Sequence, residues 1–346
     1  MSRSRRRRTR RRLRVLVLLE TGRRPPDDLE AMSDQERYDF KMEIDVLTTL
    51  RALGHEARVL EIRDELGPIR QMLFDWKPHL VLNLIESFFG LRELDQHVAS
   101  YLELLRVPYT GCNPRGLVLA RDKALAKTIL TYHRVPVPNF EVVRSGRRVR
   151  RSKRLTYPLI VKSLTEEASV GIAQASVVWD DTELDARVKF IHESITGDAL
   201  IEEFIDGREI YVGVLGNKRL TVLPPWELFF EKTAPGSVAI ATERVKHNLA
   251  YQQKHGITEG EADLEPAVRV RLIAVAKRIY RNLALDGYAR LDFRLRPDGT
   301  AFFIEANPNP EIASQEEFAQ SALKAGIKYE RLIETILALG IRRGTM

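Results

Sequence analysis

Residues 288–309 constrain the fold more than any other stretch, because apolar and polar side chains alternate there on both sides of a tight Pro-Asp-Gly-Thr turn. The apolar positions are Ala289, Leu291, Phe293, Leu295, Phe302, Ile304 and Ala306. Successive side chains of a β-strand point to opposite faces of the sheet. The stretch therefore predicts a two-stranded hairpin with one apolar face and one mostly polar face.

The polar face of this hairpin gathers two carboxylates. Apolar side chains pair with apolar ones only if the loop about residues 298–299 has an even length, and this register sets Asp292 opposite Glu305. It also sets Arg290, a fixed cation suited to phosphate oxygens, opposite Asn307. Because like charges repel across a ladder, we expect a magnesium ion held by Asp292, Glu305 and Asn307. The alternative is a solvated face on which the pair of acids is incidental.

Length, composition and cysteine usage limit the class of protein. At 346 residues the chain is long enough for two or three domains. Its hydrophobic content of 44% and charged content of 30% are those of a soluble globular protein. Cys112 is the only cysteine, which excludes a disulfide framework and fits a reducing, cytoplasmic location. The apolar run at residues 15–19 is too short to cross a membrane and does not resemble a signal peptide.

Two stretches are strongly basic. Nine arginines lie within residues 3–14, whereas the net charge of the whole chain is +7, so the remainder is slightly acidic. Residues 1–12 are therefore predicted to form a basic, disordered arm. It has no aromatic platform or reading helix, so we expect a solvated tail rather than a nucleic-acid contact. The basic run at residues 144–154 is likewise expected to be a solvated loop, with phosphate or nucleic-acid binding as the alternative.

Strands and helices alternate over the first third of the chain. Apolar runs predict strands at residues 13–19, 57–62 and 80–85, and apolar residues at helical spacing predict helices over 40–53 and 94–105. This order predicts a Rossmann-like parallel α/β domain over residues 13–118. Ligands of such sheets bind beyond the carboxyl ends of the strands, so Glu86 could bind a substrate amine; otherwise it is a surface acid. No Gly-x-Gly-x-x-Gly motif follows the first strand, which disfavours nicotinamide binding.

The remaining chain alternates less regularly. Helices are predicted over residues 122–134, 268–285 and 327–339, and strands over 158–162, 199–205 and 208–215. The small-residue segment 168–172 could offer backbone amides to phosphates. Residues 231–257 are polar without a clear period, which predicts a loop or lid.

The order and spacing of these pieces resemble the ATP-grasp superfamily and, within it, the D-alanine–D-alanine ligases, over residues 13–340. The resemblance rests on Pro108-Tyr109-Thr110-Gly111 with Asp122-Lys123, on residues 158–162 with 169–171, on residues 200–204 with Gly207 and Glu209, and on the carboxylates of the hairpin. It implies an α+β ATP-grasp fold in which the N-terminal α/β domain is followed by two subdomains, residues 119–204 and 205–346, that clamp ATP.

The resemblance also implies roles for individual residues. The implied ATP-binding residues are Lys123, Lys162, Ser169, Val170, Gly171, Glu202, Glu203, Phe204 and Glu209. The two lysines would neutralise the phosphates. Glu202 and the backbone near Phe204 would contact adenine, and Glu209 would bind the ribose. Arg290 would contact the transferred phosphoryl group, and the metal ligands would be those of the hairpin, with Mn²⁺ as a possible substitute for Mg²⁺. Lys246, in the expected lid, is a further candidate for a phosphate contact, because lid closure excludes water. A lone loop lysine is otherwise a surface residue.

The implied reaction phosphorylates a carboxylate with ATP to an acyl phosphate, which an amine attacks to give an amide. The chain departs from the family where the second substrate binds. Glu311 replaces a glycine, and a downstream serine aligns with Glu316 or, with a shift, Ser314; Ala168 replaces another serine. An acid here would repel a carboxylate and favour an amine.

These observations together predict an ATP- and Mg²⁺-dependent ligase of amino acids or dipeptides with an altered substrate segment. We expect small-molecule partners, without a membrane or nucleic-acid partner, and a homodimer is the candidate assembly. One alternative is a genuine D-alanine–D-alanine ligase. The other is a non-catalytic ATP-binding protein that uses the arginine-rich arm for a partner or nucleic acid.

Overall fold

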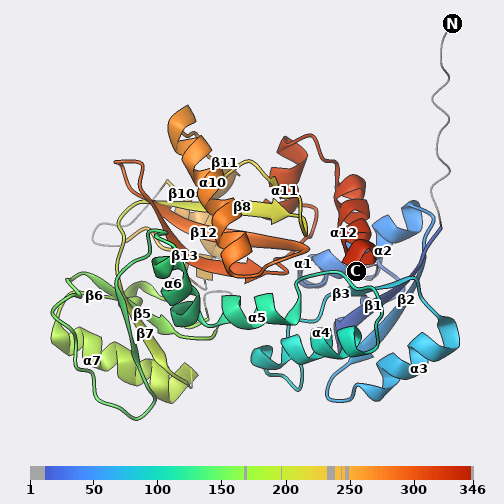
Figure 1. The fold of residues 1–346 in the computed structure, drawn as a ribbon, viewed down its shortest axis with the longest axis horizontal. Helices are drawn as coiled ribbons and strands as arrows, with labels where there is room; N and C mark the ends of the chain where they lie inside the picture. Colours follow the sequence, from blue (N-terminus) through green and yellow to red (C-terminus); the bar gives the residue numbers. More distant parts are fainter. Residues whose placement is uncertain are drawn as a thin grey trace, which may run out of the picture.

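The computed structural model of the chain describes residues 12–166, 170–195, 197–231, 238–242, 244–245 and 249–343. The strands within these ranges form three sheets (Figure 1). The predicted basic arm lies outside the described residues except for Arg12. No helix in the described ranges combines the length and the apolar character needed to cross a membrane.

The first sheet is parallel, with the order β2-β1-β3. Its strands are β1 (Arg14–Glu20), β2 (Glu56–Ile62) and β3 (Leu80–Asn83). Side chains on both faces of β1 are buried, as expected for a continuous apolar strand in a parallel sheet. The helices of this region are α1 (Asp34–Asp39), α2 (Lys41–Ala52), α3 (Gly67–Trp76) and α4 (Asp95–Leu104), with the short 3₁₀ helix η1 (Arg92–Leu94) before α4. The parallel α/β arrangement predicted for this region is confirmed.

The second sheet is antiparallel, with the order β4-β7-β5-β6. Its strands are β4 (Phe140–Val143), β5 (Leu159–Ser163), β6 (Val177–Val178) and β7 (Ala199–Glu203). The elements around it are α6 (Lys123–Tyr132), η2 (Gln174–Ser176), α7 (Asp181–Phe190) and the π-helical turn η3 (Ile191–Ile195). A separate hydrophobic cluster fills the space between this sheet and α7. The basic run at residues 144–154 is a loop, as predicted.

The third sheet has the order β11-β10-β8-β12-β13, with β9 beside β8. Its strands are β8 (Arg208–Leu215), β9 (Thr221–Val222), β10 (Trp226–Phe230), β11 (Ile257–Glu261), β12 (Tyr288–Leu295) and β13 (Ala301–Pro308), and α10 (Pro266–Asn282) packs against β8. The prediction of an irregular loop over residues 231–257 is partly wrong, because α9 (Leu249–His255) lies within it. A helix of seven residues is too short to show a clear apolar period.

The hairpin of β12 and β13 has the predicted register only at the end away from its turn. Asp292 pairs with Glu305 as expected, but closer to the turn Phe293 pairs with Phe303. The loop of residues 296–300 therefore has an odd length, contrary to the prediction, and a β-bulge corrects the register by one residue. The bulge buries Phe303 and turns Ile304 toward the same cleft as Glu305.

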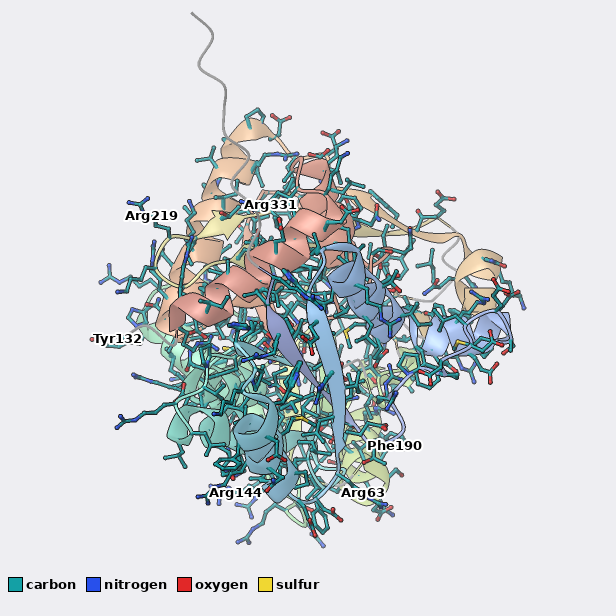
Figure 2. The ribbon with its side chains drawn as sticks, turned by 90° about the vertical axis from the view of Figure 1, so that its right-hand side faces the viewer. Arg63, Tyr132, Arg144, Phe190, Arg219 and Arg331 are labelled. Atoms are coloured by element: carbon teal, nitrogen blue, oxygen red, sulfur yellow. The ribbon has the colours of Figure 1, made fainter. Side chains whose placement is uncertain are left out.

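The last helix returns to the first sheet. Helix α12 (Tyr329–Arg343) packs against β3 and α2, and Figure 2 shows it crossing above the strands of that sheet. Buried residues of α12 share one hydrophobic cluster with β1 and with α11 (Glu317–Lys324). The first and third sheets are thus packed together through the C-terminal helices.

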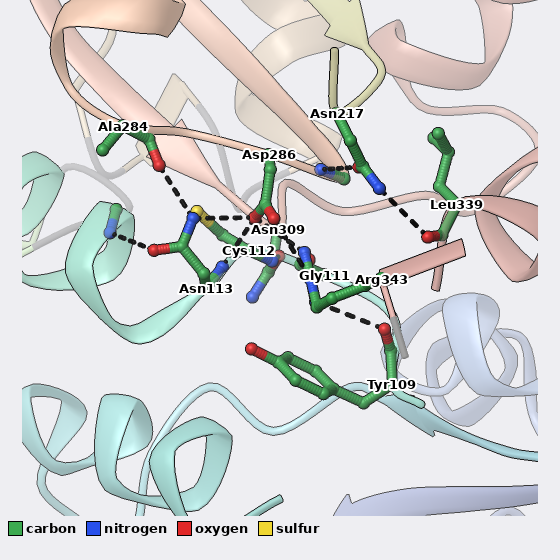
Figure 3. Close-up of polar contacts among 12 residues, drawn as sticks. Tyr109, Gly111, Cys112, Asn113, Asn217, Ala284, Asp286, Asn309, Leu339 and Arg343 are labelled. Carbon is green, nitrogen blue, oxygen red and sulfur yellow. Dashed lines mark hydrogen bonds and ion pairs between the residues drawn. The ribbon is translucent and has the colours of Figure 1, made fainter. Parts of the chain in front are cut away.

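A polar network fixes the linker that joins the first sheet to α5 (Pro114–Arg121) (Figure 3). Arg343 donates to the backbone oxygen of Gly111 at 2.6 Å and pairs with Asp286 at 2.6 Å. Asn113 also donates to Asp286, at 2.8 Å through its backbone N–H. The side chain of Asn309 accepts a hydrogen bond from the backbone N–H of Cys112 at 2.6 Å. These contacts hold the end of β13, and with it the end of the hairpin away from the turn, against the linker.

Candidate active site

A cleft lies between the second and third sheets. Its walls include many of the residues predicted from the sequence, namely Lys162, Glu202, Glu203, Phe204, Glu209, Asp292 and Glu305. Isoleucine side chains from β5, β13 and the segment after β7 lie among them. A concave site with apolar walls and a few convergent charged groups is the usual form of a small-molecule site.

A buried lysine cluster consists of Lys162 and Glu202, which line this cleft, and of Lys127 behind them. The carboxylate of Glu202 lies 2.7 Å from Nζ of Lys127 and 2.9 Å from Nζ of Lys162. All three side chains are at most 5% exposed. Burial alone would raise the pKa of Glu202, but the two lysines hold it below its usual range. With both lysines and Glu202 ionised, the cluster carries one net positive charge at the largely buried wall of the cleft.

Lys127 was not predicted from the sequence. It is fully buried in α6 and donates to the backbone oxygen of Ile304, so it also joins α6 to the bulge of β13. Burial lowers the pKa of Lys127, and the neighbouring charge of Lys162 acts in the same direction. A signal was present, because Lys123, Lys127 and Leu130 lie at helical spacing on one stripe of α6. Two lysines within an apolar stripe indicate buried charge.

The facing carboxylates of the hairpin are each next to a cation of the protein. Asp292 accepts two hydrogen bonds from Arg290, at 2.8 and 3.0 Å, and one from Nδ2 of Asn307 at 3.0 Å. Glu305 lies 3.8 Å from Nζ of Lys123. The chain therefore supplies charges of its own that offset the repulsion between these acids, and the expectation of a bound metal stays a prediction.

The donor set nevertheless fits a hard cation. Asp292 and Glu305 line the same cleft from paired positions, and Asn307 lies two residues beyond Glu305 on the same strand. In the described part of the chain there is no group of three or more His, Cys, Asp or Glu side chains suited to a metal. Two carboxylates and an amide oxygen, completed by phosphate oxygens and water, are typical of Mg²⁺ rather than of a closed protein cage.

Arg290 connects the hairpin to the acidic segment, by which we mean residues 311–317. Besides Asp292, its guanidinium binds the carboxylate of Glu317 and lies 4.8 Å from the ring centre of Tyr211. Burial opposes the charged form, but Asp292 and Glu317 raise the pKa of Arg290 well above its usual value. Arg290 is thus a permanent cation with fixed orientation at the edge of the cleft.

Glu209 lies at the far end of the cleft, and Arg294, which was not predicted, holds it there. Nη2 of Arg294 lies 3.2 Å from the carboxylate of Glu209, which also accepts a hydrogen bond from Tyr211 at 3.2 Å. Arg294 additionally donates to the backbone oxygens of Gly207 and Ala239, at 2.8 and 2.6 Å. The carboxylate therefore has a fixed position from which it can accept hydroxyl hydrogens.

The acidic segment lies outside the cleft and against α2. Lys41 of α2 pairs with Glu311 at 3.4 Å and also with Glu316. Burial raises the pKa of Glu311 to about 8, and the nearby carboxylate of Glu316 acts in the same direction. The pKa of Glu316 is raised for the same kind of reason, by burial and by Glu317. The segment therefore has more carboxylates than its cations can fully offset.

The other residues predicted for the substrate lie near this segment. The backbone N–H of Ser314 donates to Asp45 at 2.7 Å, which ties the segment to α2. Glu86 follows β3, and its backbone N–H donates to the carboxylate of Glu20 at 2.9 Å. The charge of Glu86 also raises the pKa of Glu311. The structure thus brings Glu86, Glu311 and Ser314 toward one region but keeps them out of the walls of the cleft.

Four predicted phosphate contacts lie in or near parts of the chain that are not described. Ser169 and Lys246 lie outside the described residues, as does Ala168. Gly171 adopts a φ of +69°, and its backbone oxygen accepts a hydrogen bond from Arg187. Val170 precedes it in the same turn. Lys123 donates to the backbone oxygen of Glu166, at the start of this small-residue segment.

Comparison with known proteins gives consistent results. The family model for the C-terminal part of D-ala D-ala ligase matches residues 129–338. An uncharacterized protein of Sinorhizobium fredii, y4sG, is 34% identical over 86% of this chain and 87% of its own length. A D-alanine–D-alanine ligase of Desulfotalea psychrophila is 29% identical over 73% and 76%. A crystal structure of the D-alanine–D-alanine ligase of Bacillus anthracis with ATP superposes with a TM-score of 0.74 at 20% identity, over 96% of this chain and 99% of the other.

Proposed function

The chain belongs to the D-alanine–D-alanine ligase family of ATP-dependent C–N ligases with the ATP-grasp fold, and on that premise we propose that it is a Mg²⁺-dependent ligase of amino acids or dipeptides with an altered acceptor site. The observation that carries the proposal is the meeting of the lysine cluster and the hairpin carboxylates in one cleft. Phosphoryl transfer requires positioning and charge neutralisation rather than a nucleophilic side chain.

Each wall of the cleft has a part in binding the nucleotide. Lys162, with Lys127 behind it and Lys123 near Glu305, supplies the positive charge that the phosphates need. Phe204 and the isoleucines form an apolar slot for the base, and Glu209 accepts the ribose hydroxyls. Because Glu202 is already bound by two lysines, we assign it to holding those lysines in place rather than to recognising adenine.

The chemistry follows from the position of Arg290. A substrate carboxylate oxygen attacks the γ-phosphorus of ATP, ADP leaves, and the resulting acyl phosphate is attacked by an amine, which releases phosphate. Arg290 stabilises the negative charge on the transferred phosphoryl oxygens, since its guanidinium is fixed by Asp292 and Glu317 before the reaction begins. A magnesium ion held by Asp292, Glu305 and Asn307 would neutralise phosphate oxygens of ATP.

The acidic segment determines the acceptor in this proposal. Because Glu311 and Glu316 hold their protons more tightly than usual, an amino group or a cationic side chain can replace such a proton and pair with the carboxylates, whereas an acceptor carboxylate cannot. We therefore expect the second substrate to be an amine or a basic amino acid in preference to D-alanine.

The experiment is phosphate release from ATP and MgCl₂ across a panel of D-amino acids, L-amino acids and diamines, tested singly and in pairs, with mass spectrometry of the product. Release should require a substrate pair, stop on chelation of the metal and return with Mg²⁺ or Mn²⁺. The Glu305→Gln variant should be inactive.

A D-alanine dipeptide as the preferred product would refute the altered acceptor site. Tight ATP binding without turnover on any pair would refute the ligase and favour a non-catalytic ATP-binding protein.

A further inference from the structure

A second hollow is lined by residues of β6 and α7. Figure 1 shows these two elements at the far left, away from the first and third sheets. The walls of the hollow include Ala175, Val177, Trp179, Ala186, Arg187 and Phe190, and none of its wall residues lines the nucleotide cleft. Trp179 is 58% exposed, and Phe190, labelled at the surface in Figure 2, is 38% exposed. We call this hollow the aromatic pocket. Exposed aromatic side chains around a concave surface indicate a binding site.

Arg187 places a positive charge in the wall of the aromatic pocket. The residue is only 8% exposed and forms no ion pair with an acid in the described ranges. Its Nη2 donates to the backbone oxygen of Gly171 and to Oγ of Ser176, while the ring of Phe190 lies 4.3 Å from the guanidinium carbon. Its Nε has no hydrogen-bond partner among the residues that the structure describes. A buried guanidinium without a counter-ion is unfavourable and attracts an anion.

The acid in the wall of the pocket does not neutralise this charge. Glu183 lies one helical turn before Arg187, a spacing at which the two could pair. Its carboxylate instead accepts a hydrogen bond from the backbone N–H of Trp179 at 2.8 Å. Its own backbone N–H donates to Asp180 at 2.8 Å, which completes the N-terminal cap of α7. Glu183 is thus committed to the start of the helix.

We propose that the aromatic pocket binds a small organic anion in which a carboxylate is attached to a flat apolar group. The carboxylate pairs with the guanidinium of Arg187, and the apolar group lies against Trp179 and Phe190. Both parts are needed, because the charged interaction selects the anion and the aromatic walls remove its ring from water. This site is independent of the ligase reaction.

The test uses phenylacetate and phenylacetamide, which have the same ring but differ in charge. Trp179 lines the pocket, so its fluorescence reports binding, and the Trp179→Phe variant identifies its share of the signal. Phenylacetate should change the signal saturably, and phenylacetamide should bind at least tenfold more weakly. Equal affinities for the two compounds, or a change that does not saturate, would overturn the proposal.

Two controls locate the site. The Arg187→Gln variant keeps a donor for the oxygen of Gly171 but loses the charge, and it should lower the affinity for phenylacetate at least tenfold without affecting that for phenylacetamide. If this variant does not fold, the comparison of the two compounds on the unmodified protein still shows whether the pocket prefers the anion. Saturating ADP with Mg²⁺ should leave phenylacetate bound; displacement by ADP would place the signal in the nucleotide cleft and overturn the assignment.

Discussion

The nucleotide cleft and the acidic segment both contain buried charge, but they balance it differently. In the cleft four of the acids have a cation of their own: two lysines for Glu202, Arg290 for Asp292, Lys123 for Glu305 and Arg294 for Glu209. In the acidic segment Glu311 and Glu316 share the single ammonium of Lys41. The pKa of Glu202 is accordingly lowered, whereas that of Glu311 is raised to about 8.

The difference separates a region whose charged side chains have fixed positions from a region that we propose selects the substrate. Paired charges in the cleft have rigid positions before a substrate arrives, which suits a ligand as uniform as the phosphates of ATP. The acidic segment holds unbalanced negative charge, which a proton or a cationic group can satisfy. We infer that family membership is carried by the cleft and substrate choice by the acidic segment.

The largest expected effect tests the pairing in the cleft. The Glu202→Gln variant leaves Lys127 and Lys162 buried without their shared counter-ion, so we expect the free energy of unfolding to fall by about 3–5 kcal/mol. Urea unfolding at neutral pH measures it. The matched change Glu203→Gln affects a half-exposed neighbour bound to Asn139 and should cost less than about 1 kcal/mol. Equal losses in the two variants would show that the lysines do not depend on Glu202.

The next effect concerns activity. Asp292→Asn removes the negative charge that pairs with Arg290 and that would bind a metal ion, so kcat/KM should fall about 100- to 1,000-fold. Steady-state kinetics with the preferred substrates measures it. Asp298→Asn makes the same chemical change in the turn of the same hairpin, where the side chain only accepts from the N–H of Thr300, and should leave kcat/KM unchanged. A comparable fall in both variants would indicate a structural rather than a catalytic effect.

The sequence predicted the cleft better than the acidic segment, for a physical reason. Alternation along β12 and β13 requires Asp292 and Glu305 to share a face, so the pattern predicted their pairing correctly. The same pattern predicted the wrong loop length. The bulge at Ile304 leaves no local signal, because its only effect is to shift one residue between faces. Strands β5, β7 and β8 were likewise predictable as apolar runs.

Contacts between distant elements could not be predicted in this way. Lys41 meets the acidic segment only because α2 and α11 pack against the same helix, α12, and nothing near Lys41 in the sequence indicates this. Lys127 lies on a stripe of α6 that also contains Lys123, and Arg294 lies on the polar face of the hairpin, but neither position indicates a partner. Their partners are defined by packing between sheets, which a reading of local periodicity does not provide.

A third prediction concerns the junction between the two regions. Asn309, between the hairpin and the acidic segment, faces Gly111, whose φ is +90°. A Cβ at Gly111 would lie 2.7 Å from Oδ1 of Asn309, the atom that binds the N–H of Cys112. We expect Gly111→Ala to lower the free energy of unfolding by about 2–3 kcal/mol in urea. Gly146 has a similar φ of +75° and open space around it, so Gly146→Ala should lose only about 1 kcal/mol. Similar losses would mean that Asn309 moves aside without penalty.

The smallest effect tests the unbalanced charge of the acidic segment. The pKa of Glu311 is about 8 in the folded protein, above the ordinary value of 4.5, so the folded state holds this proton more tightly than the unfolded state. Its contribution to stability is therefore present at low pH and is lost as the pH rises from about 5 through about 8. The carboxylates around it raise the pKa of Lys41, which keeps its charge over this range.

Urea unfolding of the Glu311→Gln variant at pH 5 and pH 8.5 measures this loss. The side chain is 37% exposed, so solvent screening reduces the effect to about 1 kcal/mol. The unmodified protein should lose about that much more stability than the variant between the two pH values, and the variant should be the more stable of the two at pH 8.5. An identical pH dependence in both proteins would mean that Glu311 titrates as an ordinary surface acid and that neither burial nor the neighbouring carboxylates raise its pKa.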